Sequence, residues 1–233
     1  MKTSNKILWI SSSSLIGVAL VLLMALRISL GTGLDLEKQN DTEKTWVSRH
    51  LPLSGFTDVE LGGRWEVELH RSDAERVIVE GPEDMIDELY ARKEGKKLLL
   101  ERKKHRSNKN KLTASISMPS LDYLRLSGVI ELNMNGFETS SLSIRTEGVT
   151  SIRGTKNSIQ DLHLRGEGVS KLDLRKSPVT NANLDYEGVF KVRLSMAGGE
   201  LTGKIEGVGK VLYDGQISRK AIFKEGPCKV VRE

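Results

Sequence analysis

The chain has 233 residues, of which 38% are hydrophobic, with 22 glycines, five prolines and one cysteine. This length and composition indicate one folded unit with appendages. A net charge of +5 is too small to indicate a polyanionic partner by itself, and a lone cysteine excludes an internal disulfide.

The N-terminus carries an apolar segment that differs from the rest of the chain. Lys2 and Lys6 precede residues 7–26, which contain no charged side chain. A run of about 20 such residues is long enough to span a bilayer and exceeds the usual apolar region of a signal peptide. We therefore expect a transmembrane anchor in residues 1–30, with the bulk of the chain exported. Cleavage near Leu30 would instead release a secreted protein.

A linker and the start of a folded domain are expected next. Residues 31–50 are rich in charged side chains and lack apolar periodicity, which predicts a poorly ordered linker. The folded domain would then be residues 51–233. Apolar alternation predicts its first short strands at residues 56–61, 65–69 and 77–79. A turn is expected at Gly62-Gly63, between the first two of them.

A helix and a basic tip are predicted before the regular part of the domain. Residues 83–93 resemble a short amphipathic helix that ends before Gly95. Strands at residues 98–100 and 112–118 would be joined by residues 102–111, which hold six Lys or Arg. Such a run can bind an anionic surface, or it can be a solvated hairpin loop. It lacks the interleaved aromatic residues that bind nucleic acid.

The remainder is organised around a tripeptide that returns at a nearly constant interval. Glycine is always its central residue, preceded by glutamate in all but the first copy and followed by valine in all but the last. The copies are Ser127-Gly128-Val129, Glu147-Gly148-Val149, Glu167-Gly168-Val169, Glu187-Gly188-Val189, Glu206-Gly207-Val208 and Glu225-Gly226-Pro227. The glycines are 20, 20, 20, 19 and 19 residues apart, a period typical of stacked-repeat proteins.

The interior of each repeat predicts β-strands. Apolar residues alternate with polar ones, as in Leu162-His163-Leu164, and no amphipathic helix fits between them. Coils of about 20 residues built only of strands and bends indicate an all-β fold, a parallel β-helix. The glycine is expected at a bend. The β-branched valine after it is expected to form a buried stack.

Several motifs resemble those of a known family. They are Phe56-x-x-Val59-x-Leu61-x-Gly63-x-Trp65-x-Val67-x-Leu69, then Glu80-Gly81-Pro82, and then Pro119-x-Leu121-x-x-Leu124-x-Leu126-Ser127-Gly128. Over residues 51–233 the chain resembles the head GIN domain family, also called the putative auto-transporter adhesin head domain, of bacterial envelope proteins. The resemblance implies a right-handed β-helix in an exported, membrane-tethered or surface protein. It implies no enzyme activity and supplies no catalytic residues.

Alignment on the repeated glycine places charged residues in columns. The residue before the glycine forms an acidic column: Glu147, Glu167, Glu187 and Glu206. The third residue before it forms a mainly basic column: Arg125, Arg145, Arg165 and Lys204. Equivalent positions of stacked strands lie about 4.8 Å apart, so like charges repel unless a neighbouring column neutralises them. We expect the two columns to form one solvated, mutually neutralised face.

Three sets of residues could support more specific chemistry. One glutamate per coil supplies too few oxygens for calcium, so no metal and no cofactor is expected. Asp173, Asp185 and His163 could serve a polysaccharide lyase or hydrolase, but the two aspartates occupy different repeat positions and nothing predicts that they converge. Cys228 shares a mixed column with Ile130, Thr150, Ser170 and Phe190. That column is expected at the surface or at a bend, with a semi-buried thiol in the last coil.

The sequence therefore predicts a non-catalytic binding or adhesion module of the bacterial cell envelope, held on the extracytoplasmic side of the inner membrane. Its candidate binding face is the two columns together. The expected partners are the membrane, through the N-terminal helix, and an envelope glycan or protein, but not nucleic acid. A self-assembling structural scaffold is the main alternative, although the last coil favours a monomer, because it ends in Lys229, Arg232 and Glu233 and has Pro227 in the valine column. A polysaccharide-active enzyme is the third.

Overall fold

In the computed structural model, which describes residues 45–102 and 110–233, nearly every element is a β-strand. The elements are β1 (Trp46–Leu51), β2 (Asp58–Arg71), β3 (Arg76–Pro82), α2 (Glu83–Asp87), β4 (Leu89–Glu94), β5 (Lys97–Arg102), β6 (Leu112–Met118), β7 (Tyr123–Asn135), β8 (Glu138–Thr155), β9 (Ser158–Ala197), β10 (Glu200–Gln216), β11 (Arg219–Glu225) and β12 (Cys228–Arg232). The predicted anchor, residues 1–30, lies outside the described residues. Within residues 45–102 and 110–233, no helix is long and apolar enough to cross a membrane.

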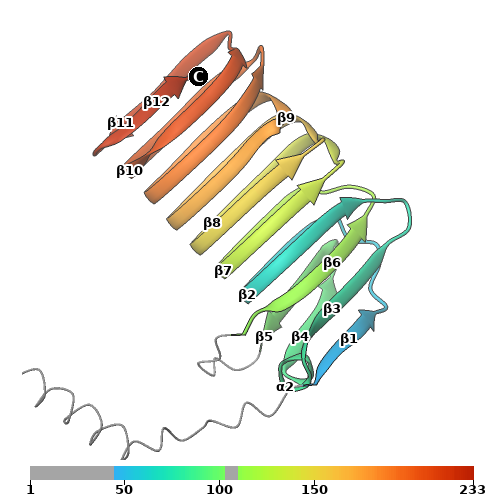
Figure 1. Ribbon diagram of the computed structural model, residues 1–233. Coiled ribbons are helices and arrows are strands. Elements are labelled where there is room, and N and C mark those ends of the chain that lie inside the picture. The colour runs from blue at the N-terminus through green and yellow to red at the C-terminus, as the bar shows by residue number, and fades with distance from the viewer. Residues whose placement is uncertain (1–44, 103–109) are drawn as a thin grey trace, which may run out of the picture. The chain divides into compact units, whose positions relative to one another are not determined.

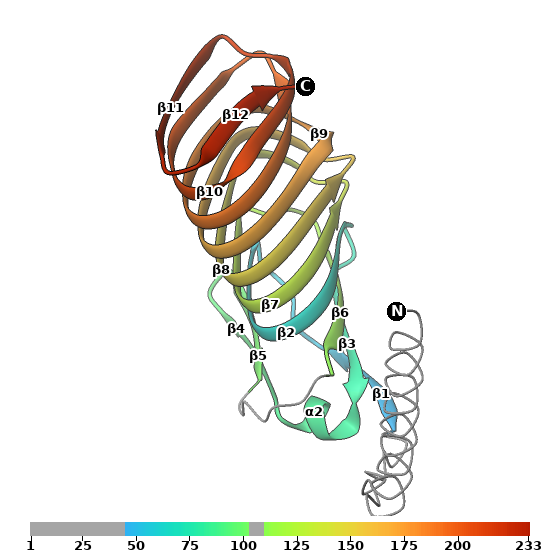
Figure 2. The same ribbon diagram turned by 60° about the vertical axis from the view of Figure 1, so that its left-hand side comes forward.

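From β7 onward the chain forms a stack of parallel coils. Gly128 of β7 lies beside Gly148 of β8, which lies beside Gly168 of β9, and the residues on either side of each glycine pair in the same register. The strands bend without ending, so each coil curves back beneath the next (Figures 1 and 2). The all-β, largely parallel architecture is thus confirmed. Its right-handed sense stays a prediction.

The repeated glycine permits the bend and the close stacking of coils. Gly148 has a φ of +98°, and a Cβ atom built on it would lie 2.5 Å from the carbonyl oxygen of Gly128 in the preceding coil. Both the backbone angle and the contact exclude a side chain. The expectation that this residue occupies a bend is confirmed.

The valine after each glycine points outward, so the predicted buried stack is wrong. Val129, Val149, Val169, Val189 and Val208 are between 43% and 53% exposed. The physical reason is the two-residue alternation of a strand. Leu164 and Leu172 are buried and lie an even number of residues apart, whereas Val169 lies an odd number from both. We call this exposed row the valine ridge.

The residues two positions after the repeated glycines form an interior column near the bends. Ile130, Thr150, Ser170, Phe190 and Cys228 are all buried there, so the expectation that this column lies at the surface is wrong. Thr150 donates a hydrogen bond from its hydroxyl to that of Ser170, at 3.0 Å, which satisfies a polar pair inside an otherwise apolar coil. The Cys228 thiol is buried in the last coil.

Substitution of valine by threonine distinguishes the two orientations with little change of shape. Val169→Thr should change the free energy of unfolding by no more than about 0.5 kcal/mol, because the side chain is half exposed. Val192→Thr should cost about 1–2 kcal/mol, because Val192 is 2% exposed and a hydroxyl there loses its hydration. Urea unfolding of both variants measures the difference. Equal losses would contradict the outward orientation of the ridge.

The first coils do not follow one another in sequence order. β2 lies between β6 and β7 in the sheet, and Gly63 of β2 pairs with Gly128 of β7. The predicted turn at Gly62-Gly63 is therefore wrong. β2 continues through both glycines, and Gly63 occupies the same bend as the repeated glycines. The chain then leaves β2, forms β3 to β6 on its far side and returns to the stack at β7 (Figure 1).

The strands on either side of the basic tip do not pair as a hairpin. β5 pairs in parallel with residues 58–62 of β2, and β6 pairs in parallel with residues 65–71 of the same strand. Together β5 and β6 form one coil beside β2, and the tip comes between them in the sequence. Residues 103–109 lie outside the described residues, so the proposed role of the tip stays untested.

Two further expectations change in this region. The predicted helix over residues 83–93 is only one turn long, because residues 89–94 form β4 and pair antiparallel with β5 through a turn at Gly95. Met85 and Ile86 are buried as expected. β1 begins at Trp46, within the predicted linker, and pairs antiparallel with β3. Its side chains are mostly exposed, so it lacks the apolar alternation of a strand.

Candidate functional site

The structure brings the predicted binding-face residues together in two neighbouring outward rows. Arg125 pairs with Arg145 and Arg145 with Arg165 along one row, which Lys204 continues beyond Asp185. Glu147, Glu167, Glu187 and Glu206 form the other row. Because successive strand residues alternate between two sides, positions three and one before the glycine share the outer side. We call these eight residues the charged face.

Neutralisation is strongest at the ends of the charged face. Arg125 Nη2 lies 3.9 Å from Glu147 Oε2. At the other end Lys204 Nζ donates to Glu206 Oε2 at 3.0 Å, and this hydrogen bond raises the pKa of Lys204. Glu167 and Glu187, in the middle, make no ion pair with any described residue. These two central carboxylates are therefore exposed and unpaired.

The valine ridge borders the acidic row of the charged face. Glu167 and Val169 are separated only by Gly168, and both side chains point outward. The same arrangement recurs at Glu147 and Val149, Glu187 and Val189, and Glu206 and Val208, so an apolar row runs alongside an acidic row over four coils. Regularly spaced apolar side chains on an outer surface are typical of an interaction site.

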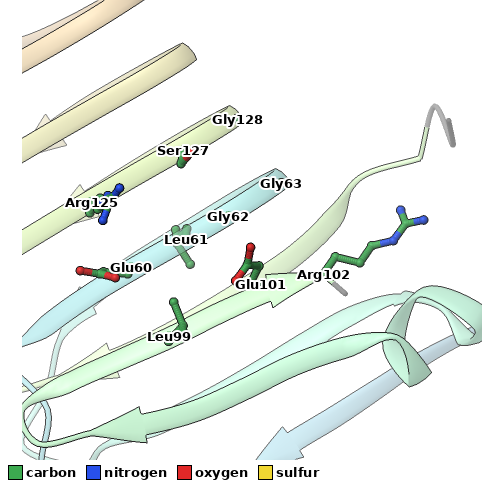
Figure 3. A pocket seen from close by; sticks show the side chains of 10 residues that line it. All are labelled: Glu60, Leu61, Gly62, Gly63, Leu99, Glu101, Arg102, Arg125, Ser127 and Gly128. Atoms are coloured by element: carbon green, nitrogen blue, oxygen red, sulfur yellow. The ribbon is translucent and has the colours of Figure 1, made fainter. Parts of the chain in front are cut away.

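A pocket of about 290 Å³ lies at the N-terminal end of the charged face. Figure 3 shows Glu60 of β2 and Arg125 of β7 on neighbouring strands, with Leu99, Glu101 and Arg102 contributed by β5. The Glu60 carboxylate in this pocket is already paired, because Lys97 Nζ contacts its Oε1 atom at 2.7 Å. This hydrogen bond raises the pKa of Lys97. The pocket extends the charged face without adding net charge.

The three residues considered for catalysis do not converge. Asp185 lies on the outer side of β9, 3.8 Å from Arg165. His163 lines a separate polar groove of about 770 Å³, together with Asp161, Asn181 and other residues. Asp173 Oδ2 accepts from Arg175 Nη2 at 2.8 Å and from a second guanidinium at 3.4 Å. None of the three faces another in a geometry suited to acid–base catalysis.

The ion pair with Arg175 holds the pKa of Asp173 at about 2, against an ordinary 3.8. A carboxyl group with a lowered folded-state pKa stabilises the fold above its unfolded pKa, and this contribution is lost as the pH falls towards the folded value. Asp173→Asn should therefore lower the free energy of unfolding near neutral pH and differ less from the unsubstituted protein at about pH 2. Urea unfolding at both pH values measures this. A difference that grew on acidification would contradict the ion-pair assignment.

The geometry offers no metal-binding cluster where the structure can be described. Across residues 45–102 and 110–233, no three His, Cys, Asp or Glu side chains are grouped closely enough to hold a metal ion. The stacked glutamates supply one carboxylate per coil, in a row, rather than the enclosing oxygen shell that calcium takes.

Sequence reasoning missed a second cluster, on the surface that follows the bend. Arg153, Lys171, Asp173, Arg175, Lys176 and Arg193 line a pocket of about 470 Å³ there. A lysine lies three residues after the last four of the six repeated glycines and gave a signal, since Lys171, Lys191, Lys210 and Lys229 all occupy that position. Arg153 and Arg193 share the position five residues after their glycines, but Lys176 could not be assigned to this surface from spacing, because a bulge shifts the register between Arg153 and Thr155.

A parallel stack of coils with a glycine at each bend and ordered rows of outward side chains is typical of solenoid repeat proteins, which present extended surfaces. Residues 55–216 match the family described as putative auto-transporter adhesin, head GIN domain. The chain belongs to this family. No curated protein matches the sequence.

Solved structures share this fold. A crystal structure of a putative adhesin from Bacteroides fragilis NCTC 9343 is similar with a TM-score of 0.63 and 17% identity, over 82% of this chain and 98% of that one. A putative lipid binding protein from Parabacteroides distasonis ATCC 8503 is similar with a TM-score of 0.50 and 17% identity, over 80% and 97%. At such identities the similarity shows the fold alone.

Proposed function

We propose that this protein is a non-catalytic binding module of the bacterial cell envelope that holds an extended glycan or polypeptide along the charged face. Membership of a family described as an adhesin head domain supports an adhesive role at the cell surface. The proposal includes the membrane anchor at residues 1–30, an extracytoplasmic domain and a right-handed coil.

The observation that carries the proposal is the valine ridge beside the charged face. Five valines in a row, one in each coil, leave half of their apolar surface in contact with water. That exposure is unfavourable, and a bound ligand that covers the row would remove it. The parallel sheet beneath fixes the spacing of both rows at about 4.8 Å per coil. A rigid surface with apolar and charged rows fits an elongated ligand, because the ligand can contact the same residue types in successive coils.

Binding of the full-length chain to a glycan array and to peptidoglycan tests the proposal. The double variant Glu167→Lys and Glu187→Lys reverses the two unpaired carboxylates at the centre of the face, and it should weaken capture by about tenfold or more. Its control, Glu80→Lys and Glu83→Lys, makes the same change of net charge at exposed positions near α2 and should bind normally. Capture that is equal for both, or turnover of a glycan by the protein, would overturn the proposal.

Self-assembly into a scaffold is the second candidate function, and one observation favours it. β11 has one partner strand among the described residues, β10, and Phe223 on β11 is 63% exposed. Exposed strand edges can pair with another chain unless charges prevent it. Because Lys220 and Lys224 lie on the same strand, we expect a monomer in analytical ultracentrifugation. Filaments that lengthen with concentration would favour the scaffold instead.

A further inference from the structure

The pocket on the surface after the bend is strongly cationic, and it is separate from the charged face. Five of the side chains that line it are basic and one is acidic. They are Arg153 of β8 and Lys171, Asp173, Arg175, Lys176 and Arg193 of β9. The pocket has a volume of about 470 Å³, which is ample for one or two oxyanion groups. We call it the cationic pocket.

Asp173 orients two of the guanidinium groups. Its Oδ1 atom accepts from Arg175 Nε at 3.0 Å, and its Oδ2 atom accepts from Arg175 Nη2 at 2.8 Å. Arg193 Nη1 lies 3.4 Å from the same Oδ2 atom. An ionised carboxylate thus bridges cations from two successive coils. Such a bridge fixes the planes of the guanidinium groups before any ligand arrives, which reduces the ordering that binding requires.

The remaining positive charge is uncompensated within the described residues. Arg153, Lys171 and Lys176 make no ion pair with any of those residues, and the buried Nε atom of Arg193 has no hydrogen-bond partner among them. The carboxylates of Asp214 and Glu233 act on Arg175 only through longer-range attraction. Like charges gathered this closely destabilise the folded protein, so structural stability does not account for the cluster.

A local irregularity of the sheet increases the number of cations. Arg153 pairs with Asp173, twenty positions on, whereas Thr155 pairs with Lys176, twenty-one positions on. The extra residue forms a bulge, and bulges re-aim neighbouring side chains. Arg175 and Lys176 are consecutive and would alternate between the two sides of a regular strand, yet both are exposed. The bulge therefore adds a second basic side chain to the same surface.

We propose that the cationic pocket binds a sulfate or phosphate ester group carried by an anionic polysaccharide. The proposal rests on the proposed binding function and names a site and a ligand class for it. Planar guanidinium groups match the oxygens of a tetrahedral ester through paired hydrogen bonds. The lining contains no aromatic side chain on which a nucleic acid base could stack. A pocket enclosed by side chains suits a group on a flexible polymer better than the flat surface of a membrane.

The test measures binding of the full-length chain to immobilised dextran sulfate, with uncharged dextran as the reference surface. The variant Arg153→Glu with Lys176→Glu should weaken binding by about tenfold or more, because it reverses two unpaired cations in the pocket. The control variant Lys96→Glu with Lys220→Glu makes the same change of net charge at exposed positions outside both the pocket and the charged face, and should weaken binding less than about threefold. Thermal melts should show that both variants fold. If the reversal unfolds the protein, Arg153→Gln with Lys176→Gln removes the charges without adding repulsion and should still weaken binding.

Each other outcome overturns the proposal. Equal weakening by the two double variants would show that net charge alone attracts the polymer. Binding of a single-stranded DNA or of phosphatidylglycerol vesicles in preference to dextran sulfate would assign the pocket to nucleic acid or to lipid. Absence of binding to dextran sulfate would exclude the ester as ligand. The proposed function would survive all of these results, because its own test uses Glu167 and Glu187 on the other surface.

Discussion

Replacement of Gly168 by alanine is expected to lower the free energy of unfolding by roughly 2–6 kcal/mol, a large part of the stability of one domain. Gly168 has a φ of +97°, a backbone angle that costs a residue with a side chain about 1–3 kcal/mol. A Cβ atom there would also lie 2.5 Å from the carbonyl oxygen of Gly148. Because that atom belongs to the backbone of the adjacent coil, the two coils must move apart, which adds about 1–3 kcal/mol.

Gly198 provides a control that separates the two causes. Its φ is +100°, close to that of Gly168, but a Cβ atom built on it meets no other atom within 4 Å. Gly198→Ala should therefore cost only the backbone term, about 1–3 kcal/mol. Urea unfolding of the full-length chain with both substitutions measures the difference. Equal losses would show that the coils are not in close contact at the bend.

The stack of coils was predictable because its main determinant repeats in the sequence. Each glycine pairs with the glycine of the next coil, so the interval between glycines is the length of a coil. The same interval aligned Arg125 with Arg145 and Glu147 with Glu167, which is why the charged face could be predicted. Residues at a fixed offset from a repeated bend share a side of the sheet.

The orientation of the valine ridge was predicted wrongly although the sequence contains the information. Valine is apolar and β-branched, which suggested that it would be buried. Val169, however, lies an odd number of residues from the buried Leu164 and Leu172, and this spacing places it on the outer side of the strand. In a strand this spacing dominates, because successive side chains must point to opposite sides. An interior side chain at Val169 would require Leu172 to turn outward.

The first coils were harder to predict because local signals competed with the repeat. Gly62-Gly63 is typical of a turn, yet the sequence from Leu61 to Trp65 aligns with that from Leu126 to Ile130, and the two pair residue by residue. In the sequence, the basic tip separates β5 from β6, the two strands of one coil. An insertion removes the glycine by which a coil is recognised, so only the pairing partners in the structure identify it.

The place of Lys176 in the cationic pocket was not predictable for a different reason. The residues of this pocket come from two strands, and the bulge between Arg153 and Thr155 changes the offset within the coil. Spacing from the glycine assigns Arg175 and Lys176 to opposite sides of the strand, whereas the structure exposes both. A register shift is a property of the pairing between two strands, and the sequence of one strand does not specify it.

Replacement of Asn157 by leucine is expected to lower the free energy of unfolding by about 3 kcal/mol or more. Asn157 is 1% exposed, and its side chain joins three coils. Its Oδ1 atom accepts from the backbone N–H of Phe137 at 3.0 Å, and its Nδ2 atom donates to the carbonyl of Met134 at 3.2 Å and to Ser177 Oγ at 2.9 Å. Leucine cannot form hydrogen bonds to these three buried groups. Each group left without a partner lowers the free energy of unfolding by about 1–3 kcal/mol.

An asparagine on the outer surface of a coil provides the control for this substitution. Asn183 is exposed, and its Nδ2 atom donates to Thr202 Oγ1 at 3.1 Å in the next coil. Asn183→Leu removes one bond whose partners water can satisfy, so the free energy of unfolding should change by no more than about 0.5 kcal/mol. Urea unfolding compares the two variants. Because each coil contacts only its neighbours, the loss at Asn157 should also increase hydrogen exchange first at the amides of Phe137 and Ser177. Uniform exchange along the whole stack would show instead that the coils unfold as one unit.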